Sequence, residues 1–352
     1  MVQGTAPRLQ IRREQTVTMD SPRIVLAHWN GLDFYGPSGM AALESVGRVL
    51  DPQPLSDFAD PRADALLAEA DVLLGHWGCP FIDSSVVDRA PSLGLIAYAA
   101  GTVKFTVAED VLDRDIRVTS GAPANAEPVA EFTLASILFA NKDVFFRRDA
   151  MRDPSLNERR QPPSRLQGNW AKTVGIVGAS MIGRRVIELL RPFPQLHVAL
   201  YDPFVDEAEA AQLVQVELLH SELCARSDVL SIHAPDIPET RRMIGAEQLG
   251  ALRPGATLIN TARGALVDHD ALLAEIESGR IYAVLDVTDP EPLPDDSPFR
   301  TSPNVFLTPH IAGSEGTELG RMTEYAVDEI RRWSAGEPAR NEITRAALSR
   351  IA

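Results

Sequence analysis

The sequence TVGIVGASMIG spans residues 173–183, and RRVIELL follows it at residues 184–190. The first apolar run ends at Gly178, and beyond Gly183 apolar side chains recur at helical spacing, which predicts a strand, a tight turn and a helix. Glycines in such a turn let main-chain N–H groups and the helix N-terminus approach a pyrophosphate. The stretch therefore indicates a dinucleotide site. The turn residues expected to bind the cofactor are Gly178, Ser180, Met181 and Ile182.

Two residues qualify this interpretation. Ser180 replaces the middle glycine of the GxGxxG pattern, and because serine is small the turn can persist with a slightly more distant phosphate. Asp202 closes the next apolar run, about 20 residues further on, where an acidic side chain can hydrogen-bond a ribose 2′-hydroxyl and repel a 2′-phosphate. An ordinary strand–helix turn would explain the glycines alone equally well. Together with Asp202, however, they predict a site that prefers NAD to NADP.

The composition is that of a soluble globular protein large enough for two domains, with 352 residues, 45% hydrophobic and 24% charged. Its net charge of -15 argues against a nucleic-acid partner and against docking on anionic membranes. No apolar run approaches the roughly 18 residues that cross a membrane. Residues 1–20 lack an apolar stretch of signal-peptide length, and we expect them to form a loose tail.

The cysteine content favours a reducing compartment. Cys79 and Cys224 are the two cysteines of the sequence, and they fall in segments predicted to belong to different domains. A disulfide framework is therefore not expected, and the cytoplasm fits best. We also expect no metal ion at the site.

Strand and helix patterns alternate in the first part of the chain. Apolar runs predict strands at residues 23–28, 71–75, 93–98 and 116–119, with a short helix at 64–70. Such alternation implies a parallel sheet covered by helices on both faces, so we predict one small α/β domain here.

A long apolar helix is predicted at residues 127–145, and residues 147–169 follow it without clear periodicity. A connection of this length is expected to be mobile or to form an arm that packs on another subunit, which favours a homodimer. Its basic cluster is interleaved with acidic residues, so a solvated face is favoured over a phosphate site. The cluster consists of Arg147, Arg148, Arg152, Arg159 and Arg160.

The alternation resumes at Thr173. The further strands are expected at residues 198–202, 228–233, 256–261, 281–287 and 305–307, with a helix at 268–278. This block has the pattern of a doubly wound nucleotide-binding sheet. A last amphipathic helix at 316–333 is predicted to pack one face on the core. That face comprises Leu319, Met322, Ala326, Ile330 and Trp333.

Three polar residues follow strands of the second block, namely Arg263, Glu291 and His310. Ligands of open parallel sheets bind beyond the carboxyl ends of the strands, where these residues fall. An arginine fork can hold a carboxylate and polarise an adjacent carbonyl. A histidine with a carboxylate partner can exchange a proton with a hydroxyl near neutral pH. Each residue alone is more typical of a structural role, but with a nicotinamide the three would support hydride transfer at C2 of a 2-hydroxy or 2-keto acid.

Three motifs resemble the signatures of the D-isomer-specific 2-hydroxyacid dehydrogenases. They are INTARGALVD at residues 259–268, LDVTDPEPLP at 285–294 and TPHIAG at 308–313. The likeness extends over about residues 72–341, and three motifs in the right order make it specific. Asn125 and residues 129–131 also resemble the family's pattern at the interdomain helix.

The resemblance implies roles for individual residues. Arg263 would bind and polarise the substrate, His310 would be the acid/base, and Glu291 would be its partner in preference to Asp289. Asp286 would face the nicotinamide carboxamide. The further residues implied at the cofactor are His233, Ala234, Pro235, Thr261 and Gly313.

The resemblance also implies an architecture of two doubly wound parallel-sheet α/β domains. A Rossmann NAD-binding domain, residues 127–313, would be inserted into a smaller flavodoxin-like substrate domain, residues 21–126 and 314–352. The two domains would close over the cleft between them.

One departure from the family concerns the glycine-rich substrate loop, usually RAGVGTD. Here it corresponds to AAGTVKF at residues 99–105, which keeps one glycine and lacks the arginine and the acid. Ala100, Gly101 and Thr102 are still expected to bind a substrate carboxylate through the main chain. Aromatic and histidine side chains near strand ends are further candidates for the cleft, with Trp77 foremost and then His28, Trp29 and His76. We therefore expect a substrate bulkier or more apolar than glycerate.

The leading hypothesis is an NAD-dependent 2-hydroxyacid dehydrogenase. One alternative is a family member that acts on phosphite or formate, although Glu291 stands where the formate enzymes resemble one another in having glutamine. The other is an NAD-sensing, protein-binding module like the family's transcriptional corepressors. The sequence leaves open the acid, the physiological direction and the effect of Ser180 on cofactor affinity.

Overall fold

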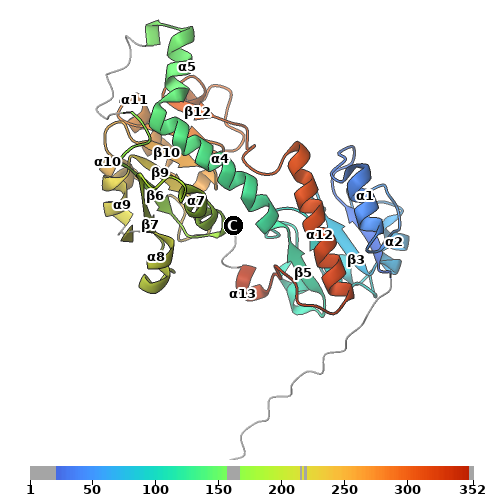
Figure 1. Ribbon diagram of the computed structural model, residues 1–352. Coiled ribbons are helices and arrows are strands. Elements are labelled where there is room, and N and C mark those ends of the chain that lie inside the picture. The colour runs from blue at the N-terminus through green and yellow to red at the C-terminus, as the bar shows by residue number, and fades with distance from the viewer. Residues whose placement is uncertain (1–20, 157–166, 215, 218–219, 349–352) are drawn as a thin grey trace, which may run out of the picture.

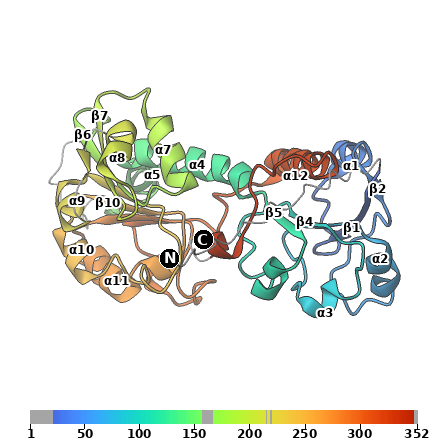
Figure 2. The same cartoon turned by 90° about the horizontal axis from the view of Figure 1, so that it is seen from below.

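Figure 1 shows the computed structural model, which describes residues 21–156, 167–214, 216–217 and 220–348. Two lobes are joined by a long helix, α4 (Ala122–Lys142), and the last long helix, α12 (Leu319–Ser334), returns to the first lobe (Figures 1 and 2). The expected tail, residues 1–20, lies outside the described residues. None of the helices that the structure describes is long and apolar enough to cross a bilayer.

The first lobe contains a five-stranded parallel sheet. Its strands are β1 (Arg23–Ala27), β2 (Arg48–Val49), β3 (Val72–Gly75), β4 (Leu95–Tyr98) and β5 (Arg117–Ser120). Their order, β2-β1-β3-β4-β5, is that of the flavodoxin-like fold, as expected. Two residues, the length of β2, are too few to give a hydrophobic pattern, which is why the sequence did not predict this strand.

Apolar side chains cover both faces of this sheet. The first lobe's helices are α1 (Gly36–Glu44), α2 (Ala63–Glu69), α3 (Ser84–Val87), η1 (Glu109–Asp113) and, from the C-terminal part, α12 and α13 (Arg345–Leu348). On α12, Met322, Ala326 and Ile330 are buried and Leu319 and Trp333 are partly buried, so the predicted apolar face does pack on the core. The predicted helix starts slightly early, because residues 316–318 form a 3₁₀ turn, η4.

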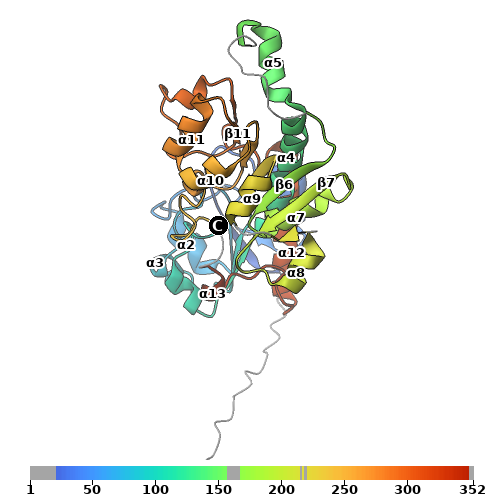
Figure 3. The same cartoon turned by 90° about the vertical axis from the view of Figure 1, so that its left-hand side faces the viewer.

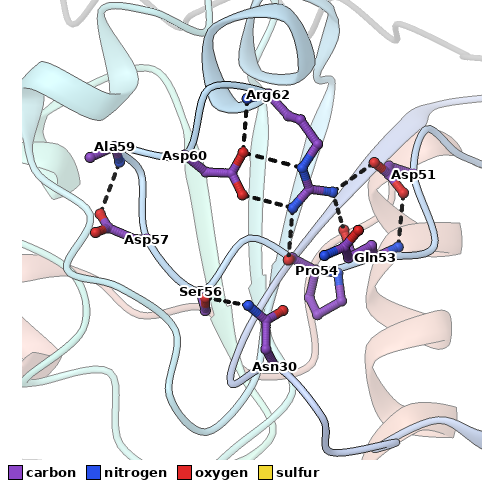
Figure 4. A network of polar contacts seen from close by, with 9 residues as sticks. All are labelled: Asn30, Asp51, Gln53, Pro54, Ser56, Asp57, Ala59, Asp60 and Arg62. Carbon is purple, nitrogen blue, oxygen red and sulfur yellow. Dashed lines mark hydrogen bonds and ion pairs between the residues drawn. The ribbon is translucent and has the colours of Figure 1, made fainter.

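A polar network fixes the connection between β2 and α2 (Figure 4). The Arg62 guanidinium forms ion pairs with Asp51 and Asp60, both at 2.8 Å, and donates hydrogen bonds to the main-chain oxygens of Gln53 and Pro54. One arginine thus holds a segment whose only strand-like pairing in the described structure is the bridge between Leu55 and Ala27.

The second lobe contains a seven-stranded parallel sheet. Its strands are β6 (Lys172–Val177), β7 (Leu196–Tyr201), β8 (Val216–Glu217), β9 (Val229–Ile232), β10 (Thr257–Asn260), β11 (Tyr282–Leu285) and β12 (Val305–Leu307). The order β12-β11-β10-β9-β6-β7-β8 reverses direction at β6, as in a Rossmann sheet. The short edge strand β8 was not predicted. The helices of this lobe include α7 (Met181–Leu190), α8 (Glu207–Leu213), α9 (His220–Arg226), α10 (Ala246–Ala251) and α11 (His269–Glu277).

The helical segment between the lobes differs from the prediction. Helix α4 begins at Ala122, five residues before the expected start, with Pro123 in its first turn and Pro128 inside it. After Asp143, whose φ is +60°, the chain forms α5 (Val144–Arg152) where no periodic structure was expected. The stacking of Phe145 on Phe306, at 4.2 Å between ring centroids, explains why this helix is stable beside β12.

Helix α5 extends beyond the second sheet at the top of Figures 1 and 3. Of the basic cluster, Arg147 pairs with Asp143 and Arg148 with Asp149, which agrees with a solvated, ion-paired face. Arg159 and Arg160 lie outside the described residues. The described part of the chain contains no group of three or more His, Cys, Asp or Glu side chains placed to hold a metal ion.

Candidate active site

The carboxyl ends of the strands meet at one edge of each sheet. In the second sheet Tyr201, Val177, Ile232, Asn260 and Leu285 are in register across neighbouring strands. The residue that follows each of them therefore lies at the same edge. These residues are Asp202, Gly178, His233, Thr261 and Asp286, all of which the sequence assigned to the cofactor.

The turn between β6 and α7 needs its two outer glycines. Gly178 has φ +96°, and a Cβ there would lie 2.8 Å from the main-chain nitrogen of Ala234. A Cβ on Gly183 would overlap the main-chain oxygen of Gly178. The turn thus brings its own backbone against the loop after β9, which fits the close approach of a pyrophosphate.

Ser180 has a structural task in this turn. It is the N-cap of α7, and its hydroxyl accepts a hydrogen bond of 3.3 Å from the N–H of Gly183. A cap of this kind satisfies one of the unpaired N–H groups in the first helical turn. The serine therefore replaces a glycine without opening the turn, and it also lines the cavity described below.

Asp202 lies beside the same turn. Its carboxylate accepts hydrogen bonds from the N–H groups of Ala179, at 2.7 Å, and Phe204, at 2.8 Å. The side chain is half-buried and does not line the cavity. Its charge stands at the end of β7, where a cofactor's adenosine ribose would lie.

A cavity of about 290 Å³ lies between the lobes. Of the predicted residues, the second lobe contributes Ser180, Met181, Ile182, His233, Ala234, Pro235, Thr261, Arg263, Asp286, His310 and Gly313, and the first lobe contributes Gly101 and Thr102. Gly178, Asp202, Glu291, Ala100 and Trp77 stand outside its lining. The cavity therefore unites most of the residues that the sequence assigned to cofactor and substrate.

His310 and Glu291 form the polar pair of the site. Their Nδ1 and Oε1 atoms are 2.6 Å apart. His310 has φ +58°, a left-handed conformation that costs energy in a non-glycine residue and persists only where its surroundings impose it. A carboxylate at this distance from Nδ1 fixes the ring's orientation and leaves Nε2 for a second partner.

Asp286 imposes that conformation, a role that the sequence did not reveal. The buried carboxylate accepts hydrogen bonds from the Thr308 hydroxyl, at 2.6 Å, and from the N–H groups of Ile311 and Ala312, both at 2.9 Å. Its main-chain oxygen accepts from the N–H of His310. One side chain at the end of β11 therefore organises the whole loop that carries His310.

Arg263 lines the same cavity as His310. Burial lowers the pKa of its guanidinium, and the charges of Asp236 and Glu291 oppose that shift, so the group remains a cation. Its Nη1 donates to the main-chain oxygen of Ala262 at 2.6 Å. The buried Asn260 amide bonds the Arg263 oxygen and the Ala262 N–H, which fixes the arginine's backbone.

The first lobe adds residues to the cavity wall that the sequence did not indicate, and two of them, Asn341 and Ile343, come from the C-terminal part of the chain. Ser120 donates from its hydroxyl to the oxygen of Gly101 and accepts at its own main-chain oxygen from Asn341, at 3.0 Å. Ser120, Asn341 and Ile343 all line the cavity, as does Asn125 on α4. No local sequence pattern predicts these contacts, because residues 341–343 are far from β5 in the sequence and pair with it only in the folded chain.

Three of the four aromatic and histidine candidates of the first lobe, His28, His76 and Trp77, pack around Phe34, whereas Trp29 is exposed. Trp77 contacts the rings of His76 and Phe34, with centroids 4.8 and 6.1 Å apart. Burial lowers the pKa of His76 to about 3 and also lowers that of His28. Trp77, His28, Trp29 and His76 stand outside the cavity lining, so a role in substrate binding stays a prediction for them.

This arrangement defines a two-lobed, dinucleotide-binding α/β protein with a cation and a histidine–carboxylate pair at the cleft. Comparison with known proteins gives the family. Residues 134–312 match the model of the D-isomer specific 2-hydroxyacid dehydrogenase NAD binding domain. The chain belongs to this family, and it contains the family's NAD-binding domain.

Comparison with individual proteins is consistent with this family. The chain is 35% identical over 326 residues to D-3-phosphoglycerate dehydrogenase of Mycobacterium bovis, covering 91% of this chain and 58% of that protein. It is 32% identical over 259 residues to glyoxylate reductase of Korarchaeum cryptofilum, covering 73% and 77% of the two chains. The crystal structure of the TT0316 protein of Thermus thermophilus matches with a TM-score of 0.71 and 31% identity, over 92% of this chain and 100% of that one. The sequence thus spans little more than half the length of the phosphoglycerate dehydrogenases that it matches.

Proposed function

We propose that this protein is an NAD-dependent dehydrogenase of D-2-hydroxy acids. The observation that carries the proposal is the His310–Glu291 pair, 2.6 Å between Nδ1 and Oε1, at a cavity that Arg263 also lines. The turn at Gly178 and Gly183 supports a dinucleotide site, because a Cβ at either position would strike neighbouring backbone and so prevent the tight strand–turn–helix packing of such a site. Bound NADH supplies the hydride that reduces C2 of a 2-keto acid.

The protein's own residues would bind the acid and move one proton. Arg263 holds the substrate carboxylate and draws electron density from the adjacent carbonyl. The protonated His310 donates its Nε2 proton to the carbonyl oxygen as it becomes a hydroxyl, and Glu291 stabilises the imidazolium before transfer. Main-chain groups of Gly101 and Thr102 complete the carboxylate site from the first lobe. In the oxidative direction the same proton returns to His310.

The substrate we propose is bulkier or more apolar than glycerate. Two features support this: the loop at residues 99–105 lacks the family's arginine and acid, and apolar residues such as Val129 and Ile343 line the cavity. A panel of 2-keto acids with apolar, polar and phosphorylated substituents, turned over with NADH, tests both activity and preference. Turnover lost in His310→Ala would support the assignment, whereas equal rates in both proteins would overturn it. Partners captured only with NADH present, without turnover of any acid, would favour the protein-binding alternative.

We also propose the division into a substrate domain, residues 21–126 and 314–352, and an NAD-binding domain, residues 127–313. The bond from the Ser314 N–H to the Asn125 side chain, 2.9 Å, lies where the two connections meet and supports a hinge there. A homodimer formed through α5 is proposed because this helix extends beyond the sheet and exposes Met151. Cytoplasmic location is proposed from the two unpaired thiols, Cys79 and Cys224. Light scattering of the purified protein tests the dimer.

A further inference from the structure

The loop that carries Glu291 has little structure of its own. Residues 288–294 follow β11, and three of them, Pro290, Pro292 and Pro294, have no N–H to donate. The side chains of Glu291 and His310 are 40% and 50% exposed, so packing does not hold them together. The 2.6 Å contact between them therefore depends on how the loop itself is anchored.

His269 provides one anchor from the first residue of α11. Its Nδ1 lies 3.1 Å from the Val267 carbonyl oxygen, which can only accept, so Nδ1 carries the proton. Its Nε2 accepts a hydrogen bond of 3.3 Å from the N–H of Asp289, two residues before Glu291. A single neutral tautomer satisfies both bonds.

The ring of His269 is itself held in place. Its edge packs on the buried Phe299, with centroids 5.6 Å apart and planes at 80°. Beside it, Gly264 is so close to the backbone of Thr288 that a Cβ there would overlap it. The start of the loop is thus fixed to the segment that carries Arg263.

The far side of the loop has a separate anchor. Arg300 donates to the main-chain oxygens of Leu293, at 2.6 Å, and Pro294, at 2.8 Å. Glu291 lies between these two attachments. The loss of either attachment leaves the carboxylate on a longer free segment, which weakens its alignment with the imidazole.

We propose that His269 is a positioning residue for the acid/base pair: by accepting from Asp289 it sets the place of Glu291 against His310. This inference rests on the proposed dehydrogenase function. His269 touches neither the substrate nor the cofactor site. Its effect on kcat depends on Glu291, so a variant that lacks this carboxylate distinguishes a positioning role from a general effect on stability.

A double-mutant cycle with Glu291→Gln tests the proposal. Both His269→Phe and His269→Leu remove the hydrogen-bond acceptor. The phenylalanine keeps a ring against Phe299, and the leucine does not. We expect either change to lower kcat about tenfold with KM for NADH unchanged, because misplaced acid/base groups lose part of their contribution. His269→Gln, whose amide oxygen can reach the Asp289 N–H, should recover most of the rate. In the Glu291→Gln background, His269→Phe should change kcat less than twofold, by the logic of such cycles.

The outcomes distinguish the positioning role of His269 from the proposed dehydrogenase function. Equal fold-losses in the wild-type and Glu291→Gln backgrounds would overturn the positioning role, as would failure of His269→Gln to restore kcat in a protein with unchanged thermal unfolding. If Glu291→Gln lowers kcat but the His269 variants match the wild type, only this inference fails. If the wild type turns over no 2-keto acid, the proposed function fails and the inference fails with it.

Discussion

The ammonium group of Lys104 donates a hydrogen bond of 3.0 Å to the main-chain oxygen of Asp236, which joins the substrate loop of the first lobe to the loop after β9 in the second. Thr102, two residues before Lys104, lines the cavity, and the charge of Asp236 acts on Arg263. The bond therefore ties the loop at residues 99–105, proposed to bind the substrate, to the lobe that holds the proposed acid/base pair.

Lys104→Met should lower kcat/KM for the keto acid about fivefold, mostly through KM, because a hydrogen bond from a charged donor contributes on the order of 1 kcal/mol even when partly exposed. Lys142→Met, at the exposed end of α4, is the matched control. Steady-state kinetics on both variants measure the difference. The same kcat/KM in the two proteins would contradict a role for the bond across the cleft.

Asp202→Asn should raise use of NADPH relative to NADH roughly tenfold, equivalent to about 1.4 kcal/mol, because it removes the charge that repels a 2′-phosphate. The asparagine oxygen can still accept from the Ala179 N–H, so the contact with the turn is kept while the bond from the Phe204 N–H is lost. Asp206→Asn, at the N-cap of α8, controls for a nearby loss of charge. The ratio of kcat/KM for the two cofactors is the measurement, and an unchanged ratio in Asp202→Asn would refute the selectivity assigned to this carboxylate.

Gly178→Ala should lower the free energy of unfolding by about 1–3 kcal/mol, because its φ of +96° is strained for any L side chain and its Cβ would press on Ala234. NADH binding, followed by fluorescence, should weaken in the same variant. Gly250→Ala is the control, since it lies in α10 with open space around it and should be neutral or stabilising by up to about 1 kcal/mol. Urea unfolding compares the two, and equal effects would show that the turn tolerates a side chain.

The free energy of unfolding should fall as the pH is lowered, because His76 is buried as a neutral ring. Its pKa is lowered from 6.5 to about 3 by burial, with the charge of His28 acting in the same direction. Below pH 6.5 the unfolded chain binds a proton that the folded chain does not, so up to about 1.4 kcal/mol is lost per pH unit until pH reaches the folded pKa. His76→Phe should flatten this dependence in urea unfolding at a series of pH values, whereas His197→Gln, at an exposed position, should not. A slope unchanged in His76→Phe would contradict the assignment.

The sequence predicts those parts of the fold that depend on local pattern. The buried strands are continuous apolar runs, Asp202 follows such a run directly and His310 comes three residues after the end of β12, so their places near the sheet edge could be predicted. Helix α5 could not, because its stability comes from the stacking of Phe145 on Phe306, far away in sequence. The same holds for Asn341, which reaches the cavity wall through a bond to Ser120.

Ser180 shows what local pattern leaves undetermined. As a departure from GxGxxG it predicts a turn that persists with a slightly more distant phosphate, and the structure adds that Ser180 caps α7. Asp286 was assigned to the nicotinamide from the family resemblance, yet its carboxylate also fixes the His310 loop through three hydrogen bonds. The Ser180 bond is local, spanning three residues, whereas the Asp286 bonds join two segments whose relative position the sequence does not specify.

In the proposed function, hydride passes to C2 of a keto acid while His310 supplies the proton. The most direct test incubates the protein with a 2-keto acid and NADH that carries deuterium at both C4 positions, and locates the label by NMR. We predict deuterium at C2 of a D-configured hydroxy acid, and loss of that product in His310→Ala with NADH still bound. Product without deuterium at C2, or the same yield from His310→Ala, would contradict the account.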